Sequence, residues 1–347
     1  MSFRHLTLAR AVFAALVMLA AALGPAAAQT SVKFALEGSI IGPYAPVLVA
    51  EDRGYYRAEA LDVTIEAAPS PPDAIARVAN GLADAGLADI NSLARFLDAN
   101  PGAQVKAVFI VYNRPPYAII SRKSRGVTQP RDLEGKRIGA PPGQMASLFL
   151  PAFIKLNSLG VEKVKIEQVA AAIREPMLAA GQIDAVTGTS FNAYLDLKER
   201  SVPLDDLVVL PMADYGLPLY GDAVVVNTAF AAAHPDAVKG LLRAVTKGLR
   251  ETIRSPTRAI ESVVKRNETA KKDIELERLR MAIRDNILTE ETQVNGLGGI
   301  DTERFARGVE LLTQVLKPKA KIGAADLFDA SFLPSPAERR IGTARPG

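Results

Sequence analysis

The spacing of hydrophobic and polar positions predicts that the chain is organised around a strand–helix–strand unit. Residues 32–36 form a short run that ends at the break containing Gly38 and is predicted to be a strand. Pro43 suits the first position of a helix, and Gly54 suits the left-handed cap that ends it. Residues 61–66 then alternate between apolar and polar side chains, as a strand does. In open α/β sheets, ligands bind beside the loop that follows such a first strand.

The same alternation continues and predicts a first lobe with further strand–loop–helix units. Pro71 and Asp73 begin a helix that runs to Asn80, with the acidic residue at the positive end of the helix. Residues 84–87 and 104–112 are predicted strands. Three loops therefore follow strands along one rim of the predicted sheet: residues 37–42, 69–73 and 88–92.

The second half of the chain repeats this order of elements. "GLADA" at 81–85 and "GQIDA" at 181–185 each end a helix and begin a strand. The further predicted strands are residues 117–121, 137–140, 164–169, 184–187 and 207–210. Residues 222–227 are predicted to return as a strand of the first lobe. Helical spacing follows at residues 235–251, 256–266, 274–288 and 302–316.

The first 28 residues are typical of a secretory signal peptide. Arg4 and Arg10 precede an apolar run at 11–23, and small residues lead to a predicted cleavage site near Ala28. An uncleaved membrane anchor is disfavoured, because the run is shorter than the roughly 18 residues that a membrane helix needs. We therefore expect an exported protein in the periplasm.

Composition excludes several kinds of chemistry. The chain has no cysteine, so disulfides and thiolate metal sites are ruled out. Of its two histidines, His5 belongs to the signal peptide and His234 precedes a proline at a helix start, which disfavours zinc and Ser-His-Asp chemistry. Without Arg4 and Arg10, 40 basic residues face 38 acidic ones, which gives no argument for nucleic acid. We predict no catalytic residue, no metal and no cofactor.

Several segments carry a family resemblance through their order and spacing. They are "VLVAEDRGYYRAEALDVTIE", "GLADAGLAD", "VTQPRDLEGKRIGAP", "AAGQIDAVTG", "YGLPLYGDAVVVNT", "GIDTERFARGVELL" and "AADLFDASFLP". Across residues 31–334 the chain resembles the type II periplasmic solute-binding proteins of ABC transporters. It is most similar to the group that binds thiamine pyrimidines, nitrate, sulfonates and taurine, with its C-terminal segments like the thiamine-pyrimidine branch.

The resemblance implies an α/β fold of the periplasmic-binding-protein-like II class. Two doubly wound α/β lobes would be joined by two crossing segments, with the ligand cleft between them. The expected boundaries are residues 29–112 and 221–321 for lobe 1 with the C-terminal helices, 113–220 for lobe 2 and 322–347 for a C-terminal tail. The expected hinge residues are Asn113, Arg114, Pro115, Pro116, Leu217 and Pro218.

Loops at the ends of predicted strands supply the candidate ligand contacts. They are Glu37, Ser39, Tyr44, Ser70, Asp89, Asn91, Tyr112, Gln144, Met145, Thr189, Phe191, Asn192, Tyr215 and Tyr220. Eight tyrosines and no tryptophan make tyrosine the amphipathic ring available for stacking on a flat ligand. Helix capping alone would explain Asp73, whereas Asp89 can cap a helix and contact a ligand as well.

Charge favours one ligand class over another. The first-lobe rim carries Glu37, Asp73 and Asp89, and Arg114 is the one obvious basic candidate at the crossing. Carboxylates accept hydrogen bonds from amino groups, so we expect a small heterocycle, with a thiamine-pyrimidine precursor as the family's suggestion. A small anion such as a sulfonate, taurine or nitrate is the alternative, since helix N-termini and an arginine bind anions.

The resemblance also implies partners and one alternative activity. A monomer would capture its ligand by lobe closure and deliver it to a membrane permease and its ATPase, or would serve a sensor instead. The same fold occurs in a thiamine-pyrimidine synthase that consumes pyridoxal phosphate and its own histidine. That enzyme has a cysteine-rich motif and an active-site histidine; this chain has no cysteine and a single histidine, His234, after the signal.

Overall fold

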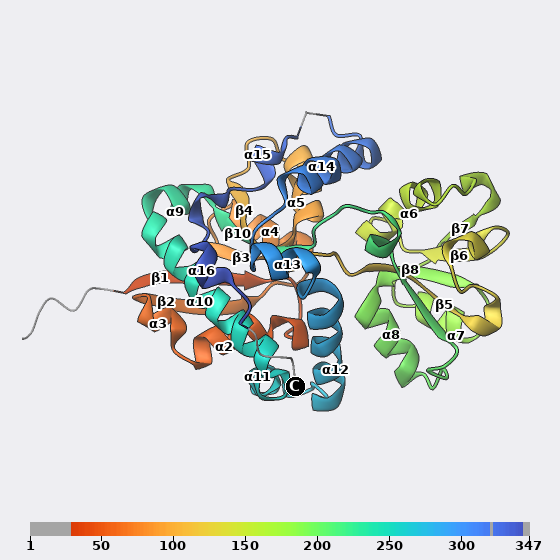
Figure 1. The fold of residues 1–347 in the computed structure, drawn as a ribbon, viewed down its shortest axis with the longest axis horizontal. Helices are drawn as coiled ribbons and strands as arrows, with labels where there is room; N and C mark the ends of the chain where they lie inside the picture. Colours follow the sequence, from red (N-terminus) through yellow and green to blue (C-terminus); the bar gives the residue numbers. More distant parts are fainter. Residues whose placement is uncertain (1–28, 320–321, 343–347) are drawn as a thin grey trace, which may run out of the picture.

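The computed structural model describes residues 29–319 and 322–342. The predicted signal peptide and its cleavage site near Ala28 lie outside the described residues. The described chain forms two lobes side by side, each built on a five-stranded sheet with helices around it (Figure 1). This is the two-lobed α/β architecture that the sequence predicts.

Lobe 1 contains the strand–helix–strand unit that opens the chain. Its sheet has the order β2-β1-β3-β10-β4, formed by Leu61–Ala67, Thr30–Leu36, Ala85–Asp89, Asp222–Asn227 and Val105–Ile110. β1 runs parallel to β2 and β3, whereas β10 is antiparallel to both β3 and β4. The sheet is therefore mixed, because β10 enters it from the opposite direction after the chain returns from lobe 2. Its helices are α2 (Ala45–Asp52), α3 (Tyr55–Ala58), α4 (Pro71–Ala79) and α5 (Ile90–Ala99).

Lobe 2 repeats the plan with its own mixed sheet, in the order β7-β6-β8-β5-β9. These strands are Lys165–Gln168, Arg137–Ala140, Ala185–Thr189, Tyr117–Arg122 and Leu207–Pro211. The helices are α6 (Met145–Leu156), α7 (Arg174–Ala179) and α8 (Ser190–Glu199). The similar segments at 81–85 and 181–185 also have the same backbone conformation at their first residue. Gly81 and Gly181 both have φ of +70°, a left-handed conformation that glycine adopts without strain.

The C-terminal helices pack around lobe 1 (Figure 1). They are α9 (Thr228–Ala233), α10 (Pro235–Arg254), α11 (Pro256–Val264), α12 (Lys272–Ala282), α13 (Glu290–Asn295) and α14 (Thr302–Leu316). The helix predicted over 274–288 is not uniform, since α12 continues into a π-helical turn at Ile283–Ile287. α10 lies so close to α2 that a Cβ at Gly248 would be 2.2 Å from the Pro46 carbonyl oxygen.

The described part of the segment predicted as a C-terminal tail, from residue 322 onward, packs on lobe 1. α15 (Ala324–Leu327) and α16 (Pro336–Arg339) pack against lobe 1. Leu327 is fully buried, and Phe328 forms a bridge with Ala107 of β4. Burial of these apolar side chains holds the segment on the sheet.

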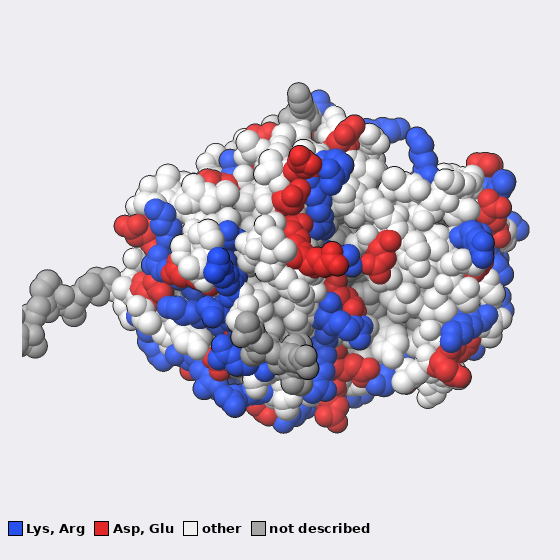
Figure 2. Space-filling view, in the orientation of Figure 1, with Lys and Arg blue, Asp and Glu red and all other residues white. Residues whose placement is uncertain are grey.

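The chain crosses between the lobes twice, between β4 and β5 and between β9 and β10. A Cβ at Gly221 would be 2.9 Å from the Cα of Pro115 and 3.0 Å from the Cβ of Tyr112, so glycine allows the two crossings to touch. Within residues 29–319 and 322–342, no helix combines the length and apolar character needed to traverse a bilayer. Figure 2 shows Lys and Arg interspersed with Asp and Glu on the face drawn.

Candidate functional site: a cleft between the lobes

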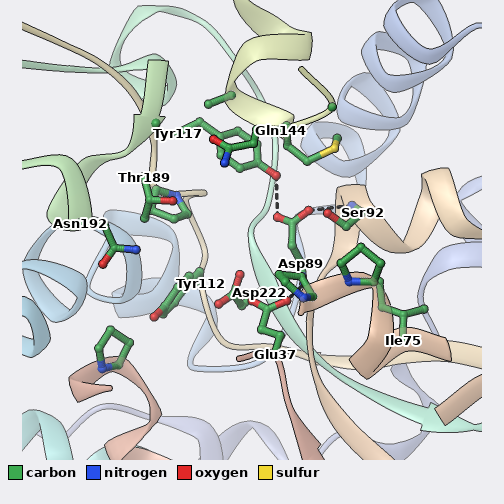
Figure 3. Close-up of a pocket in the computed structure, with 18 of the residues that line it drawn as sticks. Glu37, Ile75, Asp89, Ser92, Tyr112, Tyr117, Gln144, Thr189, Asn192 and Asp222 are labelled. Carbon is green, nitrogen blue, oxygen red and sulfur yellow. Dashed lines mark hydrogen bonds between the residues drawn. The ribbon is translucent and has the colours of Figure 1, made fainter. Parts of the chain in front are cut away.

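A cavity of about 930 Å³ lies between the two lobes, where the loops after β1, β3 and β8 meet the start of β10. Both lobes contribute to its walls (Figure 3). Ten of the fourteen predicted contact residues line it: Glu37, Ser39, Tyr44, Asp89, Tyr112, Gln144, Met145, Thr189, Phe191 and Asn192. Their contact with a ligand stays a prediction.

Three carboxylates meet on the lobe 1 wall. Glu37 follows β1, Asp89 is the last residue of β3, and Asp222 is the first residue of β10. Because β10 runs antiparallel to β3, the register pairs Asp222 directly with Asp89. Figure 3 shows Asp222 beside Glu37, with Tyr112 next to it. Among the described residues, no cluster of His, Asp or Glu has an arrangement that could hold a metal ion.

Asp89 both caps a helix and faces the cavity, as its position after a strand suggests. Its Oδ1 accepts a hydrogen bond from the Ser92 backbone N–H (2.7 Å), which caps α5. Its Oδ2 accepts one from the Tyr117 hydroxyl at 2.6 Å. Since Tyr117 begins β5, this bond joins lobe 1 to lobe 2 across the cleft (Figure 3).

Burial and mutual repulsion shift the titration of the three acids. Desolvation, with repulsion from Asp89, raises the pKa of Asp222 to about 8. Desolvation, Asp222 and Asp89 together raise the pKa of Glu37 well above its usual range. Burial also raises the pKa of Asp89, while the bond from Tyr117 opposes that shift. Asp222 therefore retains its proton near neutral pH, and an N–H donor or a cation on a ligand would take the place of that proton.

The lobe 2 wall offers hydrogen-bond donors to the cavity, whereas the lobe 1 wall offers carboxyl groups. The N-terminus of α6 faces the cavity through Gly143, Gln144 and Met145, and no side chain caps it. Arg174 is nine-tenths buried there and donates to Gln144 Oε1 at 2.6 Å and to Glu175 Oε1 at 2.5 Å. Free backbone N–H groups and a guanidinium are suited to a ligand's acceptor atoms.

The helix N-terminus on the lobe 1 side is already occupied. The backbone N–H of Gly42, which begins the short helix before α2, donates to Glu275 Oε2 at 2.6 Å. Glu275 is buried and also pairs with Arg278 at 3.1 Å. A carboxylate of the protein thus sits where a ligand anion would otherwise bind.

Four predicted contact residues do not line the cavity. Ser70 caps α4 by accepting from the Asp73 N–H, and Asn91 is buried behind Asp89. Tyr215 packs edge-on against Phe153 at 5.9 Å between ring centroids. Tyr220 turns away from the cavity, and its hydroxyl donates to Glu291 at 2.6 Å. These four residues were predicted from their residue type and their place in loops. Whether a side chain points into the cavity depends on contacts with residues that are distant in the sequence.

The predicted hinge residues lie on or beside the two crossings. Asn113 is almost fully buried, and Pro116 also lines the cavity. Arg114, the predicted basic candidate, does not line it and instead forms an exposed ion pair with Asp214 at 2.7 Å. A hinge role for these residues stays a prediction.

Sequence reasoning missed several residues of the cavity wall, among them Arg95, Tyr117, Arg174, Asp222 and Arg278. Tyr117 and Asp222 stand at strand ends beside the crossings, which is a signal that could have found them. Arg278 comes from α12, far along the chain, and no sequence signal links it to the cleft.

Comparison with known proteins finds a family model and relatives that are named as binding proteins. The family model described as "NMT1/THI5 like" matches residues 43–259. The chain is 24% identical over 303 residues to the riboflavin-binding protein RibY of Chloroflexus aurantiacus, covering 84% of this chain and 82% of that protein. It is 26% identical over 272 residues to the formylaminopyrimidine-binding protein of Halalkalibacterium halodurans, covering 76% and 79%.

An enzyme and a solved structure complete the comparison. The chain is 26% identical over 228 residues to the 4-amino-5-hydroxymethyl-2-methylpyrimidine phosphate synthase of Schizosaccharomyces pombe, covering 63% of this chain and 64% of the enzyme. The periplasmic aliphatic sulphonate binding protein SsuA of Escherichia coli has the same fold, with a TM-score of 0.69 and 13% identity over 85% of this chain and 96% of SsuA. The chain belongs to the NMT1/THI5-like family.

Proposed function

We propose that this protein is the exported substrate-binding component of an ABC import system and that it captures a small heterocycle bearing N–H donors. The observation that carries the proposal is the convergence of Glu37, Asp89 and Asp222 on one wall of the cavity. Carboxylates need donors, and a ring with an amino group supplies them in a fixed plane. The best candidate is a thiamine-pyrimidine precursor.

The opposite wall complements such a ligand. A formyl, carbonyl or hydroxyl oxygen on the far side of the ring would accept from the α6 N-terminus and from Gln144. Tyr44, Tyr112 and Phe191 also line the cavity and offer aromatic surface for the ring. A ligand with donors at one end and acceptors at the other would therefore bridge the two lobes.

Binding without conversion is the activity that the residue types favour. No lysine or histidine is among the residues that line the cavity in the described chain, so a Schiff base or histidine chemistry has no group to start from. His234 is exposed and packs on Phe230 at the start of α10, at 5.0 Å between ring centroids. The synthase-like alternative would need one of these groups in the cleft.

A small anion is the second candidate ligand. Arg95, Arg174 and Arg278 line the cavity, and the uncapped α6 N-terminus adds backbone donors. Each arginine already has an acceptor: Gly143 O for Arg95, Gln144 and Glu175 for Arg174, Glu275 and Asn192 for Arg278. Any of the three acids that is ionised would also repel an anion, so the heterocycle is preferred.

The same proposal implies where the protein acts and with which partners. The basic, apolar and small-residue pattern of the first 28 residues would direct the chain to the periplasm, where it would act as a monomer. Lobe closure would then present both lobes to a membrane permease and its ATPase.

A thermal-shift and calorimetric screen of the chain from Gln29 onward tests the ligand class. The probes are 4-amino-5-hydroxymethyl-2-methylpyrimidine, formylaminopyrimidine, riboflavin, ethanesulfonate, taurine and nitrate. A ligand at 100 times its Kd adds about 2.7 kcal/mol to the free energy of unfolding, which gives a clear rise in Tm.

The two ligand classes give different outcomes. Binding of the pyrimidines or riboflavin, with no response to the anions, supports the proposal. Binding of ethanesulfonate, taurine or nitrate alone would overturn it in favour of the anion candidate. Incubation with pyridoxal phosphate, followed by mass analysis of the chain and of the small molecules, separates a binder, which leaves both unchanged, from a synthase, which would consume pyridoxal phosphate and a histidine of the chain.

A further inference from the structure

Both crossings between the lobes are held by one side chain outside the cavity. Arg304 of α14 donates through Nη2 to the backbone oxygens of Asn113 and Leu219, both at 2.6 Å. Asn113 belongs to the first crossing and Leu219 to the second. A single guanidinium group therefore connects the two crossing segments, about which any movement of the lobes must take place.

The second terminal nitrogen of the guanidinium is also engaged. Its Nη1 donates to Asn113 Oδ1 and to Glu291 Oε2, each at 2.9 Å, and its Cζ lies 4.1 Å from the centre of the Tyr220 ring. The side chain is 17% exposed and Asn113 is 2% exposed. The planar fork with five donors suits this position, because an ammonium group could not span the two crossings in the same way.

Neighbouring contacts tie the first crossing to lobe 1 as well. Asn286, in the π-helical turn after α12, exchanges two hydrogen bonds with the backbone of Arg114, at 3.0 and 3.1 Å. Thr289 donates from its hydroxyl to Asn113 Oδ1 at 2.8 Å. The C-terminal helices thus contact the crossings at several points. Arg304 donates to the backbone of both crossings, and its partner Glu291 accepts from the side chains of Asn113 and Tyr220 at 2.9 and 2.6 Å.

The second crossing is bonded directly to the wall of the cavity. The backbone oxygen of Tyr220 accepts from Asn91 Nδ2 at 2.7 Å, and the same amide nitrogen lies 3.0 Å from the Tyr117 hydroxyl and 3.3 Å from Asp89 Oδ2. Asp89 and Tyr117 line the cavity from opposite lobes. A short chain of hydrogen bonds therefore runs from the cavity wall to the residue beneath Arg304.

We propose that Arg304 is a positioning residue for ligand capture: by clamping both crossings, it limits the range of angles between the lobes and keeps the cleft near its binding arrangement. The inference rests on the proposed capture between two lobes. Arg304 does not line the cavity, so it acts through the crossings and not by touching a ligand. Without the clamp, a smaller fraction of molecules would be competent to bind, and the apparent Kd would rise in proportion.

Interlobe distances in the ligand-free chain test the clamp directly. Because the sequence has no cysteine, Leu82→Cys and Leu204→Cys provide two spin-label sites, on exposed positions of lobe 1 and lobe 2. Arg304→Ala is expected to broaden the distance distribution and lengthen its mean. Arg304→Lys is expected to give a distance distribution of a width between those of Arg304→Ala and the native chain. The matched control is Arg307→Ala on the same helix, whose side chain is 61% exposed, and it is expected to change nothing.

A second readout concerns affinity. Titration with 4-amino-5-hydroxymethyl-2-methylpyrimidine should show Kd about tenfold higher for Arg304→Ala if the competent fraction falls tenfold, with Arg307→Ala unchanged. Failure of this pyrimidine to bind any variant would count against the proposed ligand, while the ligand-free distances would still decide the clamp.

Loss of folding has to be separated from loss of the clamp. Circular dichroism and Tm establish whether each variant is folded. If Arg304→Ala does not fold, Asn113→Ala, which removes one acceptor of the guanidinium, is used in its place and should broaden the distribution. A folded Arg304→Ala or Asn113→Ala with the same distribution as the native chain overturns the proposal.

Discussion

The side chain of Asp222 is placed by sheet register. It opens β10 opposite Asp89 and lines the cavity beside Glu37 and Tyr112. No hydrogen bond from a donor of the lobe 2 wall reaches it among the described residues. It is therefore the acid best placed to receive an N–H group from a ligand, since Asp89 already accepts from Ser92 and Tyr117.

Replacement of Asp222 by asparagine should weaken binding of an amino-heterocycle. A hydrogen bond to a charged acceptor contributes about 1.5–3 kcal/mol, so at pH 9, where Asp222 is ionised, Asp222→Asn should raise Kd about tenfold to a hundredfold. Calorimetric titration with formylaminopyrimidine measures the change. Asp62→Asn, at an exposed position of β2, is the matched control. An unchanged Kd for Asp222→Asn would remove Asp222 from the site.

The same substitution should change how stability depends on pH. The pKa of Asp222 is about 8 in the folded chain, against an ordinary value of 3.8. Between these values the folded state holds a proton that the unfolded state has released, so the free energy of unfolding falls as pH rises. Glu37 and Asp89, whose pKa values are also raised, act in the same direction.

Urea unfolding at pH 5, 7 and 9 checks this sign. Asp222→Asn should lose stability less steeply with rising pH than the native chain does, so that the difference in favour of the variant grows from pH 5 to pH 9. Asp62→Asn should follow the native chain. Parallel curves for Asp222→Asn and the native chain would contradict the raised pKa.

At the scale of elements, α8 of lobe 2 contacts α12 of lobe 1 through two ion pairs and a hydrogen bond. Lys198 pairs with Glu277, Lys271 pairs with Glu199 at 2.6 Å, and Arg278 donates to Asn192. These pairs join the lobes at one edge of the cleft. They are part-exposed, so each contributes modestly and is screened by salt.

Charge reversal at this contact should weaken ligand binding. Glu277→Lys places two lysines opposite each other, and an exposed pair of this kind is worth about 0.2–1 kcal/mol, so Kd should rise roughly twofold to fivefold. The double variant Lys198→Glu with Glu277→Lys should restore the native Kd. If the double variant binds no better than Glu277→Lys, the pair does not contribute to closure.

The C-terminal segment supports the sheet of lobe 1. Leu327 is fully buried, so Leu327→Ala should lower the free energy of unfolding by about 2–5 kcal/mol, measured by urea unfolding. Val294→Ala, at a site 82% exposed, is the control and should change it by less than about 0.5 kcal/mol. A change at Leu327 as small as that at Val294 would mean that the segment adds nothing to stability.

The elements show what sequence could predict. Turn glycines, helix-opening prolines and apolar runs predicted the described strands and the longer helices, because these signals are local, but not the short helices α3, α9, α13, α15 and α16. The pairing of Asp222 with Asp89 and the reach of Arg278 into the cavity were missed, since both depend on register and packing between distant parts of the chain. Tyr215 and Tyr220 were assigned to the cleft by residue type, although their rings point elsewhere.

At the scale of the whole molecule, lobe 2 is one continuous insertion in lobe 1. The segment from β5 to β9 forms a complete sheet, whereas the sheet of lobe 1 uses strands from before and after it. The hinge prediction and the boundaries at residues 112–113 and 220–221 concern the two points where the chain enters and leaves this insertion.

The position of β10 has a consequence for synthesis. β10 lies between β3 and β4, and it is the strand through which β4 joins the sheet. A nascent chain that has not yet reached Asp222 therefore carries β3 and β4 with no partner between them. Such unpaired edges invite contacts with other chains, and the sheet of lobe 1 can be completed only once β10, which follows lobe 2 in the chain, is available for folding.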